Sequence, residues 1–302
     1  MRAFPQVPAR IARAFPARPA DAHKYAVGTV TVVGGSAHFI NAPVIAGLGA
    51  RAAGAGLVRL VVPDASRIAA CALVPEATFV RQTATCVPPQ ADVTAVGMGL
   101  GTSPSAERLV SRILSGGTGR FVLDADALSV LARWHSGKSA AMHVTQGQTL
   151  VLTPHAGEAA RLLTCTSAEI DRDRVAAVRR IAARYNAVVV LKGRNTCVAQ
   201  PCSDEVFVCD AGNPFMAMGG MGDLLSGILA ARWARLVRHF AANGQEGEAS
   251  LAFLAAASAV WIHAAASDAI VCDDPPGDPS IVNTASAVSS LRVKLERESA
   301  YA

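Results

Sequence analysis

The strongest chemical signal in the sequence is a glycine-rich segment that runs into a helix, Gly219-Gly220-Met221-Gly222-Asp223. Glycines let several backbone N–H groups turn toward one point, and the positive end of a helix dipole adds to their potential. Such an arrangement binds an anion, typically a phosphate. Asp223 falls in the first helical turn, where it either caps the helix or acts as a base beside the anion. Three glycines in four residues favour the functional role.

Other glycine or polar residues follow predicted strands, one group after another. A turn or a helix cap explains any single group. Open α/β sheets, however, bind their ligands beyond the carboxyl ends of the strands, and several groups on that edge favour a shared site. The groups are Gly34 to Ser36, Gly97 to Gly101 with Gly99 between them, Asp124 to Asp126, Thr153 to His155, and Lys192 to Thr196 with Gly193, Arg194 and Asn195 between them.

His155 has two interpretations. Thr153 and Pro154 are typical of the cap and first position of a helix, which makes His155 an ordinary first-turn residue. Its position on the shared edge favours a ligand role instead. Glu158 is expected to interact with the dipole of the same helix.

Lys192 and the aspartates are also open to two interpretations. Lys192 is either part of a structural ion pair or a phosphate ligand, and the second is favoured for a lysine at a strand end that faces an anion site. Asp124 and Asp126 either cap the next helix or belong to the site.

Strand and helix patterns alternate along the chain, which predicts right-handed βαβ units and a mostly parallel sheet with helices on both faces. We therefore expect an α/β fold, with a single domain over residues 23–302. Residues 1–22 are rich in Arg, Ala and Pro and predict a disordered tail rather than a secretory signal. Strands are expected at 28–33, 57–62, 92–96, 120–123, 149–152 and 187–191, a hairpin at 196–209, and helices at 42–53, 104–114, 125–134, 156–163, 222–237, 247–268 and 282–296.

Composition limits the function classes. Hydrophobic residues make up 51% of the 302 residues and charged residues 17%, so a large core is expected. The net charge of +5 suits an anionic ligand, but the basic residues do not cluster as nucleic-acid binding requires. The apolar run 251–262 is too short to span a bilayer and indicates a buried helix. Seven scattered cysteines without zinc-site spacing indicate mainly buried thiols in a reducing compartment, so we expect a cytoplasmic protein.

These residues fall into blocks that resemble ADP-dependent NAD(P)H-hydrate dehydratases, the lyase domain of the bacterial nicotinamide-nucleotide repair enzymes. The resemblance covers roughly residues 23–270 and rests on block order and spacing. It implies a ribokinase-like fold, a three-layer α/β/α arrangement around a mostly parallel sheet. The blocks are His23-Lys24, 34–56, Gly97 to Gly101, Asp124 to Leu128, Leu152 to Glu158, Lys192 to Thr196 and, most diagnostic, Asn213 to Gly227.

The resemblance implies ADP- or ATP-dependent dehydration of NADHX and NADPHX, the hydrated forms of NADH and NADPH. Mg²⁺ is expected to arrive with the nucleotide phosphates, and a homo-oligomer is expected from the relatives. As a mechanism, Asp223 accepts the proton of the ring hydroxyl while that oxygen attacks the terminal phosphate. The implied hydrate pocket comprises Ala42, Gly99, Gly101, His155 and Asp223; the nucleotide site Lys192, Gly193, Arg194, Asn195, Thr196, Gly219, Gly220 and Gly222; and the supporting residues Asn213, Asp124 and Glu158.

The chain departs from the family pattern at several site positions. Met218 and Met221 stand where the family usually has Thr, and Phe215 and Asn41 where it has Gly. The segment from Lys192 to Thr196 reads K-G-R-N-T rather than K-G-A-G-T, and Arg194 offers a charged contact in compensation. Two other functions stay open at this point: a vitamin-precursor kinase of the same fold, and a silent nucleotide-binding homologue.

Overall fold

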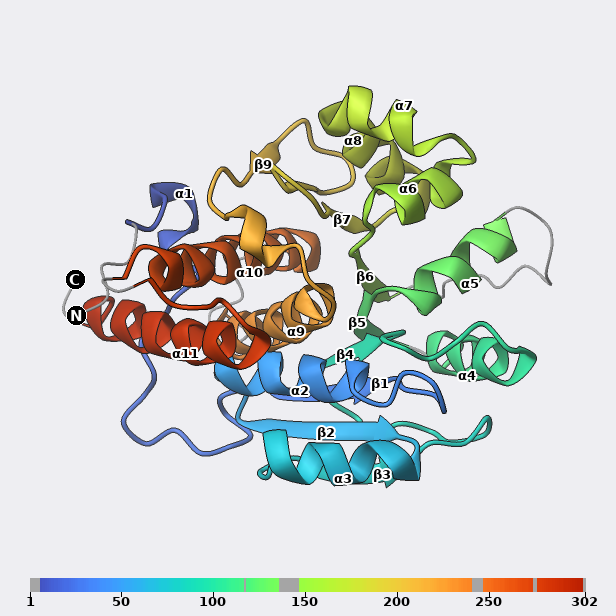
Figure 1. The fold of residues 1–302 in the computed structure, drawn as a ribbon, viewed down its shortest axis with the longest axis horizontal. Helices are drawn as coiled ribbons and strands as arrows, with labels where there is room; N and C mark the ends of the chain where they lie inside the picture. Colours follow the sequence, from blue (N-terminus) through green and yellow to red (C-terminus); the bar gives the residue numbers. More distant parts are fainter. Residues whose placement is uncertain (1–5, 117, 136–146, 241–246, 274–275, 301–302) are drawn as a thin grey trace.

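The computed structural model describes residues 6–116, 118–135, 147–240, 247–273 and 276–300. Its centre is a nine-stranded sheet in the order β3-β2-β1-β4-β5-β6-β7-β8-β9 (Figure 1). The first seven strands along the chain pair in parallel, and β8 and β9 add an antiparallel edge. The strands are β1 Thr29–Val33, β2 Leu57–Val62, β3 Thr78–Arg81, β4 Val93–Val96, β5 Gly119–Leu123, β6 Gln148–Leu152, β7 Val188–Leu191, β8 Cys197–Ala199 and β9 Val206–Val208.

Helices cover both faces of this sheet, which makes three layers (Figure 1). The central strands are mostly apolar, and their side chains alternate between the two faces. Val30 and Val32 of β1, for example, enter the core under α2 and α9, whereas Val33 enters the core on the opposite face. The helices are α1 Ala9–Ala12, α2 Ala42–Ala52, α3 Asp64–Leu73, α4 Pro104–Leu114, α5 Asp126–His135, α6 Ala156–Leu163, α7 Ser167–Arg172, α8 Arg174–Tyr185, the 3-10 turn η1 Pro214–Met216, α9 Met221–Phe240, α10 Glu248–Val271 and α11 Ile281–Glu298.

A glycine seam brings α2 and α9 into backbone contact. A Cβ atom built on Gly227 of α9 would overlap the carbonyl oxygen of Ala46 of α2. In the same way, a Cβ atom on Gly49 of α2 would overlap the carbonyl oxygen of Leu224 of α9. Two helices can approach this closely only where a hydrogen replaces the side chain. The seam therefore fixes the helix that begins at the anion-binding segment against its neighbour.

Part of the predicted disordered tail is ordered. Phe15 is buried, packs edge-on against Trp261 of α10, and lies under the guanidinium of Arg232. Arg232 also donates to the carbonyl oxygen of Ala14, and Arg235 donates to that of Ala17 at 2.7 Å. Tertiary contacts of buried arginines thus order residues that local composition alone predicts to be disordered.

Most predicted elements form within a few residues of their expected bounds, and the mostly parallel α/β sheet is confirmed. The sequence patterns missed β3, α3, α7 and α8, which lie in polar or weakly patterned stretches. By length and composition α10 is long enough to cross a membrane, but 89% of its most apolar window is buried in the protein. The prediction of mainly buried thiols was wrong, because Cys71, Cys202 and Cys272 are exposed.

Candidate active site

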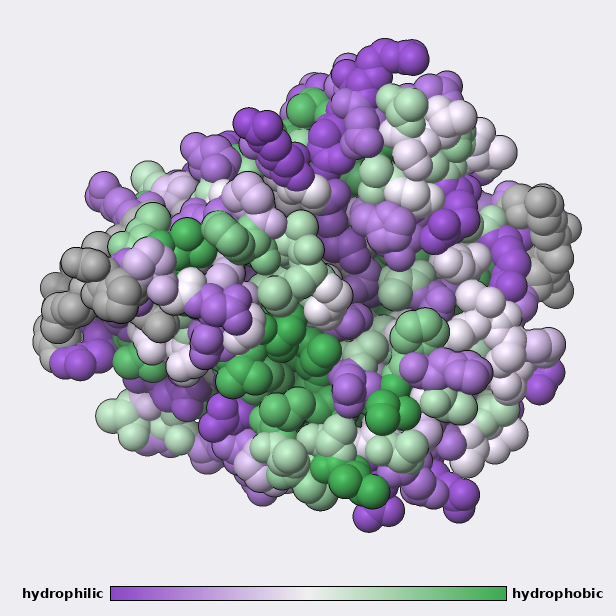
Figure 2. Space-filling model, viewed as in Figure 1, coloured by the Kyte–Doolittle hydropathy of each residue, from purple (hydrophilic) through white to green (hydrophobic). Residues whose placement is uncertain are grey.

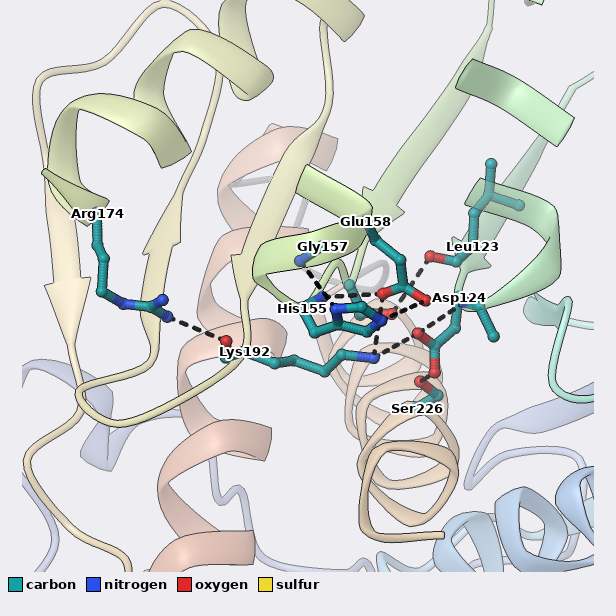
Figure 3. Close-up of polar contacts among 10 residues, drawn as sticks. Leu123, Asp124, His155, Gly157, Glu158, Arg174, Lys192 and Ser226 are labelled. Carbon is teal, nitrogen blue, oxygen red and sulfur yellow. Dashed lines mark hydrogen bonds and ion pairs between the residues drawn. The ribbon is translucent and has the colours of Figure 1, made fainter. Parts of the chain in front are cut away.

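The carboxyl ends of β5 and β7 meet in a buried ion pair. Lys192 Nζ lies 2.6 Å from Asp124 Oδ1 and 3.9 Å from Glu158 Oε2 (Figure 3). Ser226 of α9 donates to the other oxygen of Asp124 at 2.7 Å. Burial lowers the pKa of Lys192, but the carboxylates of Asp124 and Glu158 outweigh it and raise that pKa overall. The structure therefore confirms an ion pair for Lys192, and it places the same ammonium at the predicted anion site, because a Cβ atom on Gly222 would lie 3.3 Å from Nζ.

His155 begins α6 as its N-cap. Its Nδ1 accepts the N–H of Gly157 at 3.0 Å, and Glu158 accepts the backbone N–H of His155 at 2.8 Å. The prediction that Thr153 caps this helix and Pro154 opens it was wrong, because the helix starts later, at Ala156. Pro154 instead accepts the N–H of Lys192 at 2.8 Å and so joins the ends of β6 and β7. The His155 side chain is exposed at the edge of the site, where a ligand can reach it.

The loop after β4 forms a second wall of the site. The N–H of Gly101 donates to Asp126 Oδ2 at 2.7 Å, so this aspartate positions the loop. Gly99 has a φ of 63°, and a Cβ atom there would lie 2.5 Å from the Cβ of Phe39 and 3.0 Å from that of Ala42. Three of the predicted hydrate-pocket residues, Ala42, Gly99 and Gly101, are therefore close together.

The segment that leads into α9 is held by α10. The Asp268 carboxylate accepts the N–H of Gly212 and the side-chain amide of Asn213, both at 2.8 Å. Ser267 accepts the same amide at 3.1 Å, and the Asn213 oxygen accepts the N–H of Phe215 at 3.2 Å. Sequence analysis assigned Asn213 a supporting role but missed Asp268 and Ser267. No sequence motif marks these two residues, because their role arises only where α10 packs beside the glycine segment.

Asp223 lies in the first turn of α9, beside the predicted anion-binding backbone. Burial, and next to it the negative charge of Asp124, raise its pKa to about 7, although the positive charge of Lys192 lowers it. A carboxyl group with a pKa near neutrality is suited to take up and release a proton during a reaction. Asp223 therefore has the electrostatic environment of a general base.

A cleft of about 1070 Å³ opens along this edge, between the loop that follows β7 and the segment that precedes α9. Figure 2 shows the surface hollowed between η1 and α6. His263 of α10 forms part of its wall; burial lowers the pKa of this imidazole to about 4, so it is neutral. The predicted site residues that line the cleft are His155, Lys192, Gly193, Arg194, Asn195, Thr196, Asn213, Gly219 and Gly222.

The remaining predicted residues, Ala42, Gly99, Gly101, Asp124, Glu158, Gly220 and Asp223, do not line this cleft. They lie behind it or on the side of α2. The site thus has two parts, the cleft, which His155 and most of the predicted nucleotide-binding residues line, and a second area at Ala42, Gly99 and Gly101 of the predicted hydrate pocket. Asp223 stands where the two meet, because it follows Gly222 of the cleft and is within electrostatic reach of Asp126.

Metal ligation by protein groups alone is not found here. Over the described ranges, no three or more His, Cys, Asp and Glu side chains gather in a way that could hold a metal ion. Asp124 and Glu158 are engaged with Lys192 and the α6 cap.

Comparison with known proteins agrees with this geometry. A family model described as NAD(P)H-hydrate dehydratase matches residues 30–280. The chain is 39% identical over 270 residues to an ADP-dependent (S)-NAD(P)H-hydrate dehydratase of Neisseria meningitidis, covering 88% of this chain and 84% of that one. It is 36% identical to a bifunctional NAD(P)H-hydrate repair enzyme of Escherichia coli over 72% of this chain and 40% of that one. The chain thus spans about half the length of the bifunctional relatives or less.

Solved structures show the same fold. An ADP/ATP-dependent NAD(P)H-hydrate dehydratase of Bacillus subtilis, co-crystallised with ATP and Mg²⁺, superposes with a TM-score of 0.77 at 23% identity, over 94% of this chain and 96% of that one. A ribokinase-like protein of Enterococcus faecalis superposes with a TM-score of 0.75 at 23% identity, over 96% and 95%. The predicted ribokinase-like fold is therefore confirmed. Given the matched family model and the relative that is similar along most of its length, the chain belongs to the NAD(P)H-hydrate dehydratase family.

Proposed function

We propose that this protein uses ADP or ATP to dehydrate NADHX and NADPHX back to NADH and NADPH. One observation carries the proposal: Asp223, with a pKa of about 7, directly follows the glycine backbone of a cleft large enough for a nucleotide. That juxtaposition brings a base and a phosphate-binding backbone to one point, which the reaction requires. The similarity to an ADP-dependent (S)-NAD(P)H-hydrate dehydratase supports the same assignment.

The reaction begins when Asp223 accepts the proton of the ring hydroxyl. The hydroxyl oxygen then forms a bond to the terminal phosphorus, and the remaining nucleotide leaves as AMP or ADP. Backbone N–H groups from Gly219 to Gly222 stabilise the charge that develops on the phosphate. Phosphate next leaves the ring carbon with the bonding electrons. Loss of a proton from the adjacent ring carbon restores the double bond.

The cleft residues divide the work of nucleotide binding. Lys192, whose pKa is raised, supplies a permanent positive charge next to Gly222. Arg194 is exposed at the rim, where its guanidinium can reach a phosphate. Mg²⁺ would neutralise part of the phosphate charge when it arrives with the nucleotide. We expect Arg194→Ala to weaken ADP binding in calorimetry; an unchanged Kd would exclude this role of Arg194.

The decisive test incubates the protein with hydrated NADH, Mg²⁺ and either ADP or ATP, and follows the return of dihydronicotinamide absorbance in the near ultraviolet. Recovery that needs the nucleotide supports the proposal and names the preferred nucleotide. Asp223→Asn should abolish the recovery and still bind ADP. If folded protein gives no recovery with either nucleotide, the proposed activity is wrong, and a stable phosphorylated product would then indicate a kinase.

Three further expectations belong to this proposal. We infer one catalytic domain over residues 23–302, a cytoplasmic location and a homo-oligomer. The seven free cysteines support a reducing compartment. Light scattering of the purified chain measures the oligomeric state, and fractionation of the source cells measures the location.

A further inference from the structure

Phe39 is a large aromatic side chain that is left on the surface beside the site. It lies on the loop between β1 and α2 and is 59% exposed. A single exposed apolar residue is ordinary in itself. The position of Phe39 is specific, however, because a Cβ atom built on Gly99 would lie 2.5 Å from the Cβ of Phe39 and 3.0 Å from that of Ala42. Both neighbours belong to the predicted hydrate pocket.

The first turn of α2, which follows Phe39 in the chain, also lies next to the anion-binding backbone. A Cβ atom on Gly220 would lie 2.9 Å from Cδ1 of Ile45. Ile45 follows Ala42 by three residues, which is about 4.5 Å along a helix. Phe39 and Gly220 therefore both lie near the first turn of α2, and Asp223 follows the glycine backbone that would hold the phosphate.

Two glycines near these groups have open surroundings, and apolar side chains lie close to the glycine segment. A Cβ atom on Gly101 or Gly219 would have no neighbour within 4 Å. Met218 is 40% exposed on the same side as Gly219, and Ile281 of α11 adjoins Gly220. Figure 2 shows a hydrophobic patch where α2, α9 and α11 meet. An exposed aromatic ring beside such open surroundings is suited to stack on a flat, conjugated ligand.

The dinucleotide substrate has two ends on which an aromatic ring can stack, the planar adenine and the conjugated part of the hydrated nicotinamide ring, and geometry selects one of them. The hydroxyl that Asp223 must deprotonate is on the nicotinamide ring, so this ring has to lie at the junction beside Gly220. The adenine end is the full length of a dinucleotide away from that hydroxyl. Only the nicotinamide end can therefore contact Phe39 while the hydroxyl reaches Asp223.

We propose that Phe39 is a substrate-binding residue that stacks on the conjugated face of the hydrated nicotinamide ring and directs the ring hydroxyl toward Asp223. This inference rests on the proposed function, and it adds a contact made by the side chain of the β1–α2 loop. Stacking needs an aromatic ring but no hydroxyl, so tyrosine should replace phenylalanine at this position and alanine should not.

The test compares Phe39→Ala and Phe39→Tyr with a matched control, Ile68→Ala, which removes another exposed apolar side chain, 82% exposed on α3. Four quantities are measured for each protein: the KM for hydrated NADH, and the Kd values for ADP, for the product NADH, and for reduced nicotinamide mononucleotide, which has no adenine. We expect Phe39→Ala to raise the KM and both Kd values for reduced nicotinamide ligands about tenfold. The Kd for ADP should not change, and Phe39→Tyr and Ile68→Ala should match the parent protein.

Each alternative result has a definite meaning. An unchanged KM in Phe39→Ala overturns the proposal. A weaker Kd for NADH with an unchanged Kd for the mononucleotide overturns it as well, because Phe39 then contacts the adenine. If the parent protein binds both reduced ligands without repairing the hydrate, the proposed function fails, and the two Kd values still decide the role of Phe39. A parent protein that binds neither reduced ligand overturns the stacking contact.

Discussion

The raised pKa of Asp223 predicts that this proposed catalytic residue destabilises the folded protein near neutral pH. The folded protein gives this carboxyl a pKa of about 7, against an ordinary value of 3.8. Between these two values the folded state binds more protons at this site than the unfolded state does. The free energy of unfolding therefore falls as pH rises from about 4 to about 7. In Asp223→Asn this side chain carries no charge, so it no longer lowers the free energy of unfolding as pH rises.

The size of the effect follows from the same two values. They differ by about 3 pH units, and each unit corresponds to about 1.4 kcal/mol, so the greatest difference is about 4 kcal/mol. Asp223 is partly exposed, and solvent reduces the effect, so we expect Asp223→Asn to be about 2–4 kcal/mol more stable than the parent at pH 8. The gain should shrink by about 1 kcal/mol per unit as pH falls from 7 and nearly vanish near pH 4.

Urea denaturation of both proteins at a series of pH values between 4 and 8.5 measures this difference from the transition midpoints and a common slope. The pair of proteins near pH 4 serves as the internal control, because the pH is then close to the ordinary pKa of the carboxyl and the difference nearly vanishes. A variant that is no more stable than the parent at pH 8, or a gain that does not change with pH, would refute the reasoning. In either case burial does not hold the pKa of Asp223 near 7.

Three other predictions test separate parts of the structure. The kcat/KM for hydrate repair should rise as pH increases through about 7, because Asp223 must be deprotonated to act as a base; a profile that is flat from pH 5.5 to 8.5 contradicts that role. Gly227→Ala should lower the free energy of unfolding by about 3 kcal/mol or more, because its Cβ atom overlaps the Ala46 carbonyl. Gly219→Ala is the control: its Cβ atom would have no neighbour within 4 Å, so the free energy of unfolding should stay unchanged in the same denaturation assay. Asp268→Asn should raise the KM for the nucleotide several-fold, because the side chain loses an acceptor for Gly212 or Asn213, and Ser267→Ala should have a smaller effect. Equal KM values in the parent and both variants would show that these hydrogen bonds do not position the glycine segment for nucleotide binding.

The sequence predicted those parts of the fold that depend on local patterns. The buried strands are recognisable in the sequence as short apolar runs. The start of the helix near Asp223 was predictable because glycines precede it and helix-forming residues follow it. The edge strand β3 was not predicted, because Thr78 and Arg81 are exposed and only the pairing with β2 makes the segment a strand. The ordered conformation of residues 6–22 was also not predicted, because it depends on arginines more than 200 positions away along the chain.

The site divides in a similar way. Residues at strand ends were predictable because parallel strands bring their carboxyl ends to one edge, and Lys192, Asp124 and His155 do lie there. Asp268 was not predictable from pattern, because its role arises only when α10 packs beside the glycine segment. The same holds for the contact of Phe39 with Gly99, which needs the positive φ of the glycine and the exact course of the β1–α2 loop.

The glycine seam between α2 and α9 also limits how the protein can move. Helices in backbone contact cannot slide or rotate past one another without a clash, so the first turn of α9 and the start of α2 must move as one piece. The seam therefore holds Asp223 and Ala42 on two helices that pack as one unit. We expect the distance between them to change less on ligand binding than their distances to the loop from Gly193 to Thr196, which is not part of the seam.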